Sequence, residues 1–498
     1  MSRWANICLG AGRPAGAVVV GIGIAMALCG VVGLVAAFFS HSADISEDIR
    51  QAIALGLSSV ITVLVGGVVR WRSPRDQASS LSRRQAIFSV AVIWLASGVF
   101  GALPYLLAAR MSPIDSLFEA FSGFTTTGAT VVDNIETTLK RPLLLWRSIT
   151  QWLGGMGIVV LFVAVLPNVG VGAKIMFHGE VPGATLQDLR PRIADTSSFL
   201  WRAYLLLTVV ATVLLWAVGM SPFEALCHAM TSAATGGFST RSNSIAAFES
   251  LAIELVIAGV LLVSSINFGL YYAAISGRSL RGFIRSTELR VFGLIALIST
   301  LILTVCITPH HGSVTTAFRR AFFESVSFVT SACFGTDSTV RYPPLAMLVL
   351  MFLLLIGGCS GSTSGGIKVE RLILLVKMGL SQVHATFRPN VIRVVRMNGQ
   401  RIHPSVLSDV AAFLVVYLGC LVLCSLLVSA IENAPAPVSF AASLSCLSNM
   451  GELPFHENVH SFAGFSAPTK LLLSLAMVLG RLEFFTLFAL FLPDFWKR

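Results

Sequence analysis

The sequence predicts an all-α polytopic membrane protein, and three observations support that fold class. Of its 498 residues, 55% are hydrophobic and only 12% are charged, unlike a soluble domain. Apolar runs of about 20 residues, long enough to cross the hydrocarbon of a bilayer, recur from one end of the chain to the other. The basic residues gather in particular connections between these runs. Together these features exclude a soluble multidomain protein.

Ten spanning helices are expected from the apolar runs. Arg3 and Arg13 precede a first run that is too long for the core of a cleaved signal peptide, and no A-x-A cleavage site follows it. An even number of spans leaves both termini on one side of the membrane. The expected spans are residues 17–39, 51–70, 86–108, 142–166, 198–219, 250–275, 287–308, 343–380, 404–431 and 468–493.

The charges predict the orientation. Residues 70–84, 278–290 and 368–401 hold five, four and seven Arg or Lys residues, whereas the connections on the other side are acid-rich or mixed. The positive-inside rule puts the basic connections and both termini in the cytoplasm. The net charge of +11 therefore follows from topology, and no nucleic-acid partner is expected. The nine cysteines are scattered and form no C-x-x-C pair, so neither a metal knuckle nor a disulfide framework is indicated.

After the first two spans, one unit repeats four times: a spanning helix, a shorter semi-apolar segment and a second spanning helix. The short segments, residues 113–130, 221–240, 315–339 and 436–455, each hold about a dozen helix-compatible residues and end in a small or hydroxyl-rich run. We interpret them as re-entrant half-helices followed by extended backbone. The expected domains are residues 1–80 (two transmembrane helices and a cytoplasmic loop), 81–180, 181–280, 281–400 and 401–498 (one repeat each).

Spacing within the short segments is regular. In three segments, a residue within the expected half-helix lies nine positions before a residue of the small or hydroxyl-rich run. The pairs are Glu119 and Gly128, Glu324 and Cys333, and Ala442 and Gly451. In the second unit Glu224 precedes Gly237 by thirteen residues, which predicts one extra helical turn. Four such elements predict a pseudo-fourfold arrangement of M1–P-loop–M2 repeats around a central pore.

Extended backbone at membrane depth survives only when it is buried in protein or lines a polar cavity, because unpaired backbone groups are costly in lipid. Four such stretches around one axis would form a ring of carbonyl oxygens. Such a ring replaces the hydration shell of an alkali cation, and glycine lets the backbone turn its oxygens inward. The pattern therefore favours a cation pathway.

Five stretches carry a resemblance to a known family: "FSGFTTTGAT", "ITQWLGGMGIVVLFVAVLP", "ATGGFST", "GGCSGSTSGGIK" and "GRLEFFTLFALF". They resemble motifs of the Trk/Ktr/HKT superfamily of potassium transporters, and within it the bacterial TrkH-type membrane subunits, over nearly the whole chain. The resemblance implies potassium uptake across the bacterial inner membrane by a homodimer with one pore per protomer. It also implies regulation by a cytoplasmic ring of TrkA-type nucleotide-binding subunits, with potassium as substrate and no covalently bound cofactor.

The resemblance implies that backbone carbonyls in each repeat bind potassium. Carried over by position, they belong to Thr126, Thr127 and Gly128; to Thr235, Gly236 and Gly237; to Ser331, Ala332 and Cys333; and to Asn449, Met450 and Gly451.

Two repeats depart from the family pattern. In the third, the expected glycine falls on Cys333, and Gly335 fits only if the chain slips by two residues; a Cβ atom disfavours the φ values that glycine allows. In the fourth, "GEL" replaces a "GPG"-like turn, so Glu452 is expected to add an acid near the outer mouth. Selectivity for potassium over sodium stays open on this basis.

The expected span 343–380 is close to twice the length that crosses ~30 Å of hydrocarbon, so it must break. The glycine-rich stretch "IGGCSGSTSGGIKVERL" marks the break, and Lys368 the point where the chain leaves the membrane. A phosphate-binding loop is disfavoured, since Ile367 separates Gly366 from Lys368. The resemblance implies an intramembrane gate below the filter, formed by Gly357, Gly358, Gly361, Ser362, Thr363, Gly365 and Gly366.

Arg481 lies near the centre of the last expected span, where a cation costs roughly 2.5 to 3.5 kcal/mol and needs partners. One interpretation pairs it with Glu483 or nearby carbonyls. The other, which the resemblance also implies, directs it into the pore, where it holds the 357–366 loop by hydrogen bonds to carbonyls.

Other polar residues have two interpretations each. Glu119, Glu224 and Glu324 either steer ions or complement the macrodipole at the start of a helix. His228 is interpreted as a packed, hydrogen-bonded histidine, and Cys420 and Cys424 as core residues. The basic segment 385–404 either contacts anionic lipid or binds a soluble regulator.

The alternative function is an alternating-access transporter for another cation or a small solute, which inverted repeats would favour and parallel repeats disfavour. An enzyme is not expected, because the spans hold no paired acid and base or metal cluster. Coupling to a proton or sodium gradient, and the regulatory nucleotide, stay open.

Overall fold

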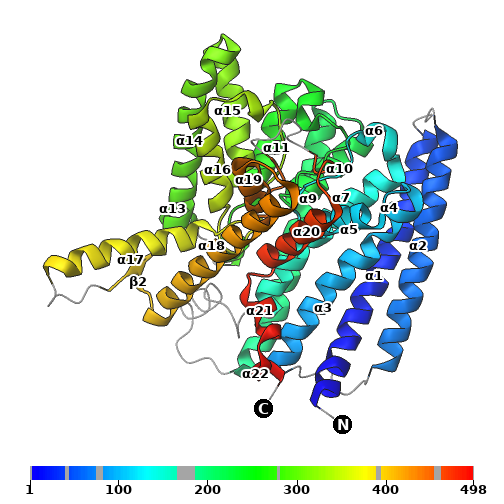
Figure 1. The fold of residues 1–498 in the computed structure, drawn as a ribbon, viewed down its shortest axis with the longest axis horizontal. Helices are drawn as coiled ribbons and strands as arrows, with labels where there is room; N and C mark the ends of the chain where they lie inside the picture. Colours follow the sequence, from blue (N-terminus) through cyan, green and yellow to red (C-terminus); the bar gives the residue numbers. More distant parts are fainter. Residues whose placement is uncertain are drawn as a thin grey trace.

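The structure is a computed structural model that describes residues 3–39, 44–73, 82–164, 186–276, 281–388, 394–453 and 461–496. These residues are mostly helical (Figure 1). The described strands form one short antiparallel hairpin, β1 (Arg396–Met397) with β2 (Gln400–Arg401). The predicted all-α class is confirmed.

Two long helices, α1 (Arg3–Phe39) and α2 (Ile45–Arg72), pack side by side at one edge of the molecule (Figure 1, blue). Glycines allow their backbones to approach closely, since a Cβ atom on Gly16 would lie 2.7 Å from the carbonyl oxygen of Gly66. Packing of small residues is the usual means by which helices associate in lipid, where no hydrophobic driving force exists between them.

The four predicted units follow, each with a first helix, a short helix that ends inside the protein, and a second helix. Unit 1 contains α3 (Arg83–Gly101), α4 (Leu103–Ala108), α5 (Pro113–Phe124), α6 (Ile135–Thr138) and α7 (Arg141–Ala164). Unit 2 contains α9 (Leu186–Ala217), α10 (Pro222–Ala233), α11 (Leu251–Ser264) and α12 (Phe268–Ser276). Unit 3 contains α13 (Arg281–Arg285), α14 (Thr287–His311), α15 (Val314–Val329), α16 (Pro344–Ile356) and α17 (Val369–Phe387). Unit 4 contains α18 (Pro404–Glu432), α19 (Ala436–Leu447), α20 (Ala467–Arg481), α21 (Phe485–Phe491) and α22 (Pro493–Trp496). Two 3₁₀ turns, Ser244–Phe248 and Thr339–Arg341, lie in connections.

Serine followed by proline starts the short helices of units 1 and 2. The Oγ of Ser112 accepts a hydrogen bond from Asp115 N, and the Oγ of Ser221 accepts one from Glu224 N. Proline at the first helical position lacks an N–H that would be unpaired there anyway. Both α5 and α10 have 12 residues, about 18 Å, so neither can cross a bilayer.

Six described helices are long and apolar enough to span a membrane, and two bent pairs bring the number to eight. The predicted break within 343–380 is present, because α16 ends at Ile356 and α17 begins at Val369. The end of the expected span 142–166 and several predicted basic residues, among them Arg75, Arg278 and Arg393, lie outside the described residues.

Two predicted spans are wrong as straight helices. Within 250–275, α11 and α12 meet at 80°, and within 468–493, α20 and α21 meet at 114°. The second bend has a local cause: Glu483 and Phe484 have φ values of +56° and +54°, which interrupt the helix between Arg481 and Phe485.

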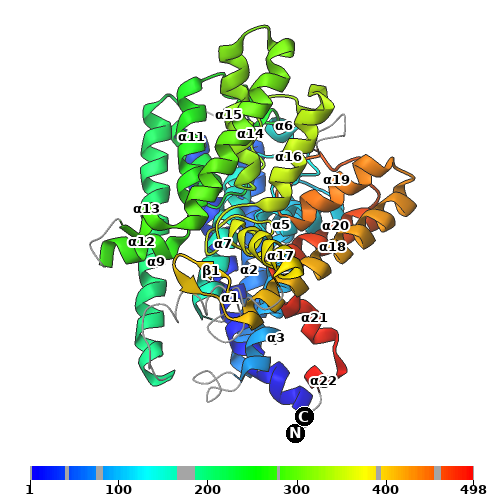
Figure 2. The same cartoon turned by 90° about the vertical axis from the view of Figure 1, so that its left-hand side faces the viewer.

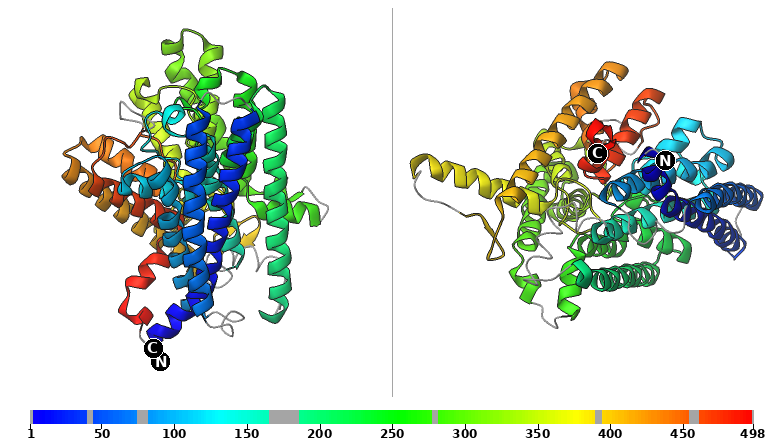
Figure 3. Two further views of the ribbon diagram at one scale, coloured as in Figure 1. Left: turned by 90° about the vertical axis from the view of Figure 1, so that its right-hand side faces the viewer. Right: turned by 90° about the horizontal axis from the view of Figure 1, so that it is seen from below.

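The helices α1 and α22 reach the same end of the molecule, where both termini lie (Figures 1 and 2). Seen from that end, α17 projects from one side of the bundle, and α1 and α2 form the opposite edge (Figure 3, right). The short helices point into the region between these edges, and the turns that follow them meet there.

Candidate functional site

The turns that follow the four short helices share one backbone conformation. In each, the second and fourth residues have positive φ: +54° and +84° at Thr126 and Gly128, +51° and +78° at Thr235 and Gly237, +56° and +49° at Ser331 and Cys333, and +56° and +83° at Asn449 and Gly451. In each turn, the N–H groups of the second and third residues donate to carbonyls near the end of the preceding helix, with N···O distances of 2.9 to 3.3 Å. We refer to these four segments, residues 125–129, 234–238, 330–334 and 448–452, as turns 1 to 4.

The turns lie against one another in order. A Cβ atom on Gly128 would lie 2.2 Å from the carbonyl oxygen of Gly236 in turn 2. One on Gly237 would lie 1.8 Å from that of Ala332 in turn 3, and one on Gly451 would lie 2.4 Å from that of Thr127 in turn 1. Glycine is required at these positions both by the positive φ and by the neighbouring carbonyl.

In turn 3, Cys333 holds the position that glycine holds in the others. It adopts φ of +49°, a conformation that costs a non-glycine residue of the order of 1–3 kcal/mol. Gly335 lies beyond the turn, where its carbonyl accepts hydrogen bonds from Ile245 and Ala246 N. A Cβ atom on Gly128 would lie 2.8 Å from the Cβ of Cys333, so the cysteine points toward the space that the turns share.

A cavity of about 630 Å³ opens above the turns. Its lining includes the fourth residues of turns 1 to 3, namely Gly128, Gly237 and Cys333, together with Asp133 and Asp337. Both acids have partners: Ser461 Oγ donates to Asp133 at 2.5 Å, and Asp337 lies 2.8 Å from His311 Nε2. The cavity therefore reaches the ends of three turns.

Two buried acidic side chains accept hydrogen bonds from the chain directly after turns 1 and 3. Glu119 accepts hydrogen bonds from Thr130 Oγ1 and Val131 N and pairs with Arg147 at 2.7 Å. Glu324 accepts from Thr336 N and Oγ1 in the same way. Both lie well inside their helices, so the macrodipole interpretation applies only to Glu224, in the first turn of α10.

The predicted extra helical turn in unit 2 is wrong. The two short helices α5 and α10 have equal length, and the residue nine positions before Gly237 is His228. His228 takes the place of the acid: its Nε2 lies 3.0 Å from Ser239 Oγ and its Nδ1 lies 2.8 Å from the Glu224 carbonyl. It is the packed, hydrogen-bonded histidine that the sequence predicts. Cys424 is buried in the core, and Cys420 is half-buried.

Turn 4 differs from its predicted role in one respect. Glu452 is fully buried and does not line the cavity, so the prediction that it adds an acid to the outer mouth is wrong. The neighbouring Asn449 side chain links turn 4 to the rest: its Nδ2 donates to Thr127 Oγ1 in turn 1 and to the Met477 carbonyl of α20.

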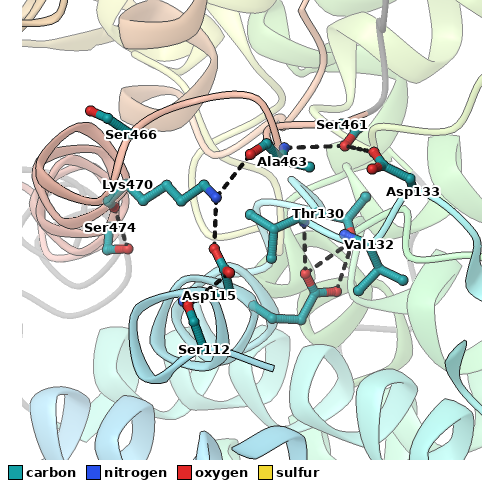
Figure 4. A network of polar contacts seen from close by, with 12 residues as sticks. Ser112, Asp115, Thr130, Val132, Asp133, Ser461, Ala463, Ser466, Lys470 and Ser474 are labelled. Atoms are coloured by element: carbon teal, nitrogen blue, oxygen red, sulfur yellow. Dashed lines mark hydrogen bonds and ion pairs between the residues drawn. The ribbon is translucent and has the colours of Figure 1, made fainter. Parts of the chain in front are cut away.

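The chain after turn 4 packs onto turn 1 (Figure 4). Phe462 N donates to the Thr130 carbonyl at 2.7 Å, and Lys470 Nζ reaches both the carboxylate of Asp115, at 2.7 Å, and the Ala463 carbonyl. Lys470 lies in α20, and its charged side chain is buried. These contacts join the last unit to the first.

The glycine-rich segment 357–368, which we call the loop, lies against the other end of the turns. Gly365 N donates to Ser331 Oγ of turn 3 at 2.6 Å, and Gly366 N donates to the Ser448 carbonyl of turn 4 at 3.0 Å. Thr363 Oγ1 contacts Thr235 Oγ1 of turn 2 at 3.3 Å. The loop therefore contacts three of the four turns.

Arg481 is buried and joins the loop to α7. Its guanidinium donates to the Thr363 carbonyl at 2.9 Å and to the Gly154 carbonyl at 3.3 Å. Glu483 does not pair with it, because that carboxylate binds Arg371 of α17 at 2.6 Å. Lys368, which the sequence predicts to mark the point where the chain leaves the membrane, is buried within the protein, with φ of +81°, and its Nζ donates back to the Ser364 carbonyl.

Several N–H groups of the loop have protein partners, which agrees with the sequence-based argument against a phosphate loop. Besides Gly365 and Gly366, Ser360 N donates to Glu288 Oε1 at 2.6 Å and Cys359 N donates to the Ser265 carbonyl. An anion-binding loop would leave such groups free for its ligand.

Sequence reasoning missed Arg147, Gln151 and Lys470. Each is a buried polar residue within an apolar helix, the signal that drew attention to Arg481. Arg147 and Gln151 lie one turn apart in α7, and both contact turn 2. The same signal, applied to every span, would have identified them.

The chain is similar to proteins of known kind over nearly its full length. The sequence profile of the TrkH family, described as "Cation transport protein", matches residues 50–498. The Trk system potassium uptake protein TrkH of Salmonella typhimurium is 35% identical, over 95% of this chain and 99% of that protein. Its counterpart TrkG of Escherichia coli is 35% identical, over 89% of this chain and 91% of that protein. The crystal structure of the potassium transporter TrkH from Vibrio parahaemolyticus superposes with a TM-score of 0.84 at 32% identity, covering 97% of this chain and 99% of that one.

Proposed function

The chain belongs to the TrkH family of cation transport proteins, and on that premise we propose that it takes up potassium ions through the four turns. It is a multi-pass membrane protein of a transporter family, not an enzyme. The curated relatives are named potassium uptake proteins, and the match extends over nearly all of their length.

The observation that carries the proposal is the repeated conformation of the turns. Positive φ at the second and fourth residues recurs four times, each time with the same two hydrogen bonds to the helix end. A residue sequence that alternates between the two halves of φ space can aim successive carbonyls to one side, and a ring of carbonyls can replace the hydration shell of potassium. We assign the filter to residues 126–128, 235–237, 331–333 and 449–451, in a pseudo-fourfold arrangement.

We assign the gate to the loop and Arg481. The loop lies at the end of the turns opposite the cavity and is bonded to turns 2, 3 and 4. A buried cation bound to the loop would also repel a potassium ion waiting below the filter. Opening therefore requires the loop and Arg481 to move together.

The assembly follows from the same family. We propose a homodimer in the bacterial inner membrane, with both termini in the cytoplasm and a TrkA-type nucleotide-binding ring as regulator. The helix α17 projects from the bundle directly after the loop, so a partner that moves α17 would act on the loop (Figure 3). An alternating-access transporter is the less favoured function, because the four turns lie against one another in chain order and each short helix precedes its turn in the same way.

The test is ion flux into liposomes that contain the purified protein, with potassium compared with sodium, in the presence and absence of a regulatory ring. We expect flux that strongly favours potassium and that depends on the ring. Flux that is equal for the two ions, or none with either, would contradict the proposal.

A further inference from the structure

Turn 2 has a gap behind its third residue that the other turns do not have. The third residues of turns 1, 3 and 4 are Thr127, Ala332 and Met450, whereas turn 2 has Gly236. The side chain of Gln151, from α7 of unit 1, fills this gap: a Cβ atom on Gly236 would lie 2.4 Å from its Cδ and Oε1. A residue of one unit thus completes the filter strand of the next.

The amide of Gln151 also holds both sides of that residue. Its Nε2 donates to the Gly236 carbonyl at 2.7 Å, and its Oε1 accepts from Phe238 N at 3.0 Å. The orientation of the amide is determined by its partners, because a carbonyl can only accept and an N–H can only donate. Glutamate lacks the donor and leucine lacks both groups, so no residue of similar size can replace it fully.

Arg147 lies one helical turn before Gln151 and contacts the next part of the strand. Its Nη1 donates to the Ser239 carbonyl at 2.9 Å, and its guanidinium carbon lies 3.5 Å from the centre of the Phe238 ring. Its charge is paired with Glu119 of α5, and both side chains are at most 2% exposed. Residues at i and i+4 lie on one helix face, so this face of α7 presents two polar side chains to turn 2.

Unit 4 shows that hydrogen bonds like those from Gln151 to turn 2 are not a general feature of the units. Gly154 of α7 and Gly480 of α20 correspond, since Cβ atoms there would lie 1.9 and 2.0 Å from the last carbonyl of the adjoining short helix. The residue three positions before Gly480 is Met477, whose side chain cannot form hydrogen bonds of this kind. The position is therefore polar in unit 1, as Gln151, and apolar in unit 4, as Met477.

We propose that Gln151 is a positioning residue that sets ion specificity, by fixing the Gly236 carbonyl in the ring of third-residue carbonyls. This carbonyl is shared between the Gln151 amide and the ion path, so its direction and its field at the ion depend on that amide. Discrimination between potassium and sodium depends on the position and field of such carbonyls. The inference rests on the proposed function, because it concerns the specificity of the same filter.

The experiment measures potassium and sodium flux into liposomes for the full-length wild type and three variants. We expect Gln151→Leu, which keeps the size but loses both hydrogen bonds, to lower the potassium-to-sodium flux ratio by about tenfold. Gly236→Ala alone should push the end of the Gln151 side chain aside and reduce correct assembly, because the new Cβ atom would clash with it. The double variant Gln151→Ala with Gly236→Ala removes that clash and should restore assembly without restoring the ratio.

The double variant separates positioning from packing. If it recovers both assembly and the wild-type ratio, Gln151 only fills space and the inference is overturned; a wild-type ratio for Gln151→Leu overturns it too. Thr62→Val is the matched control, because Thr62 is equally buried but bonds only within α1 and α2. A wild-type protein without preference for potassium would instead contradict the proposed function.

Discussion

The four turns and the loop that contacts them are held in place by different kinds of hydrogen bond. Each turn is bonded to its own short helix by the same two backbone hydrogen bonds, and neighbouring turns approach within contact distance. The loop exists once, and single hydrogen bonds join it to the turns: Gly365 N and Gly366 N donate to turns 3 and 4, and Thr363 Oγ1 accepts from Thr235 Oγ1 of turn 2. The turns are held by hydrogen bonds within one segment of the chain, and a shift of one helix relative to another leaves these bonds intact. The loop is held by contacts between distant segments, which a shift of α17 or α20 can break.

If the turns are the filter and the loop is the gate, as we propose, this difference separates specificity from regulation. A binding ring needs positions fixed to a fraction of an ångström, which short-range bonds and close packing supply. A gate needs two arrangements of similar free energy, which a glycine-rich segment held by contacts with distant parts of the chain can have. Substitutions in the turns should therefore abolish or change selective flux, and substitutions at the loop should change its regulation.

The largest effect is expected from Gly237→Ala. The new Cβ atom would lie 1.8 Å from the Ala332 carbonyl at a φ of +78°, so the turns could not keep their contact. We expect potassium flux to fall by about 100-fold or more, measured in liposomes at equal protein content. Gly259→Ala in α11 is the control, because nothing lies within 4 Å of a Cβ atom there. Normal flux in Gly237→Ala would remove turn 2 from the ion path.

The next effect concerns Arg481→Ala, which removes the bonds to the Thr363 and Gly154 carbonyls together with a buried positive charge. We expect potassium flux without any regulatory ring to rise by about tenfold. The control is Arg202→Ala, since that side chain is exposed and donates to the Ser198 carbonyl of its own helix. Unchanged flux in a well-expressed variant would argue against the gate.

A smaller effect is expected from Ser331→Ala, which deletes the acceptor of Gly365 N and the bond of that hydroxyl to the adjacent Thr330 carbonyl, while it leaves the backbone bonds of turn 3 in place. Loss of one buried hydrogen bond of about 1 kcal/mol should raise the ring-independent flux by about fivefold. Ser97→Ala serves for comparison, because that buried hydroxyl donates to the Ile93 carbonyl of its own helix, α3. Equal flux in both variants would mean that the loop is not held through turn 3.

The smallest effect is expected from Cys333→Gly, which gives turn 3 the residue of the other three turns. It relieves the strain at φ of +49° and removes a side chain from the space that the turns share. We expect a potassium-to-sodium flux ratio about two- to threefold higher, since the ring becomes more uniform. A ratio equal to that of the wild type would place Cys333 outside the ion path.

Much of this organisation was predictable from the sequence because it depends on local pattern. The apolar runs predict the spans, and the small and hydroxyl-rich ends of the short segments predict the turns. The break at residues 357–366 follows from the low helix propensity of glycine and serine. The bend at Glu483 and Phe484 did not follow, because neither residue is a helix breaker by composition, and their positive φ values are visible only in the structure.

The contacts of the buried polar residues near the turns were harder to predict from the sequence, for another reason. Arg147 and Gln151 look like isolated polar residues in the sequence, and their partners lie 28 to 92 positions away. The correspondence of His228 with Glu119 was hidden because the chemistry of the side chain differs while the place in the helix is the same. Glu452 was misplaced because sequence order does not say on which side of a turn a side chain lies.

By itself the sequence determined the class of the protein, the four units and the positions of the turns, since apolar length, repeated spacing and glycine content act through neighbouring residues. The tertiary structure decided the order in which the turns meet, the choice of Cys333 over Gly335, and the contacts of Arg481, Lys368 and Gln151. These contacts depend on how helices far apart in the chain pack, and packing selects partners by shape and by the need to pair every buried polar group.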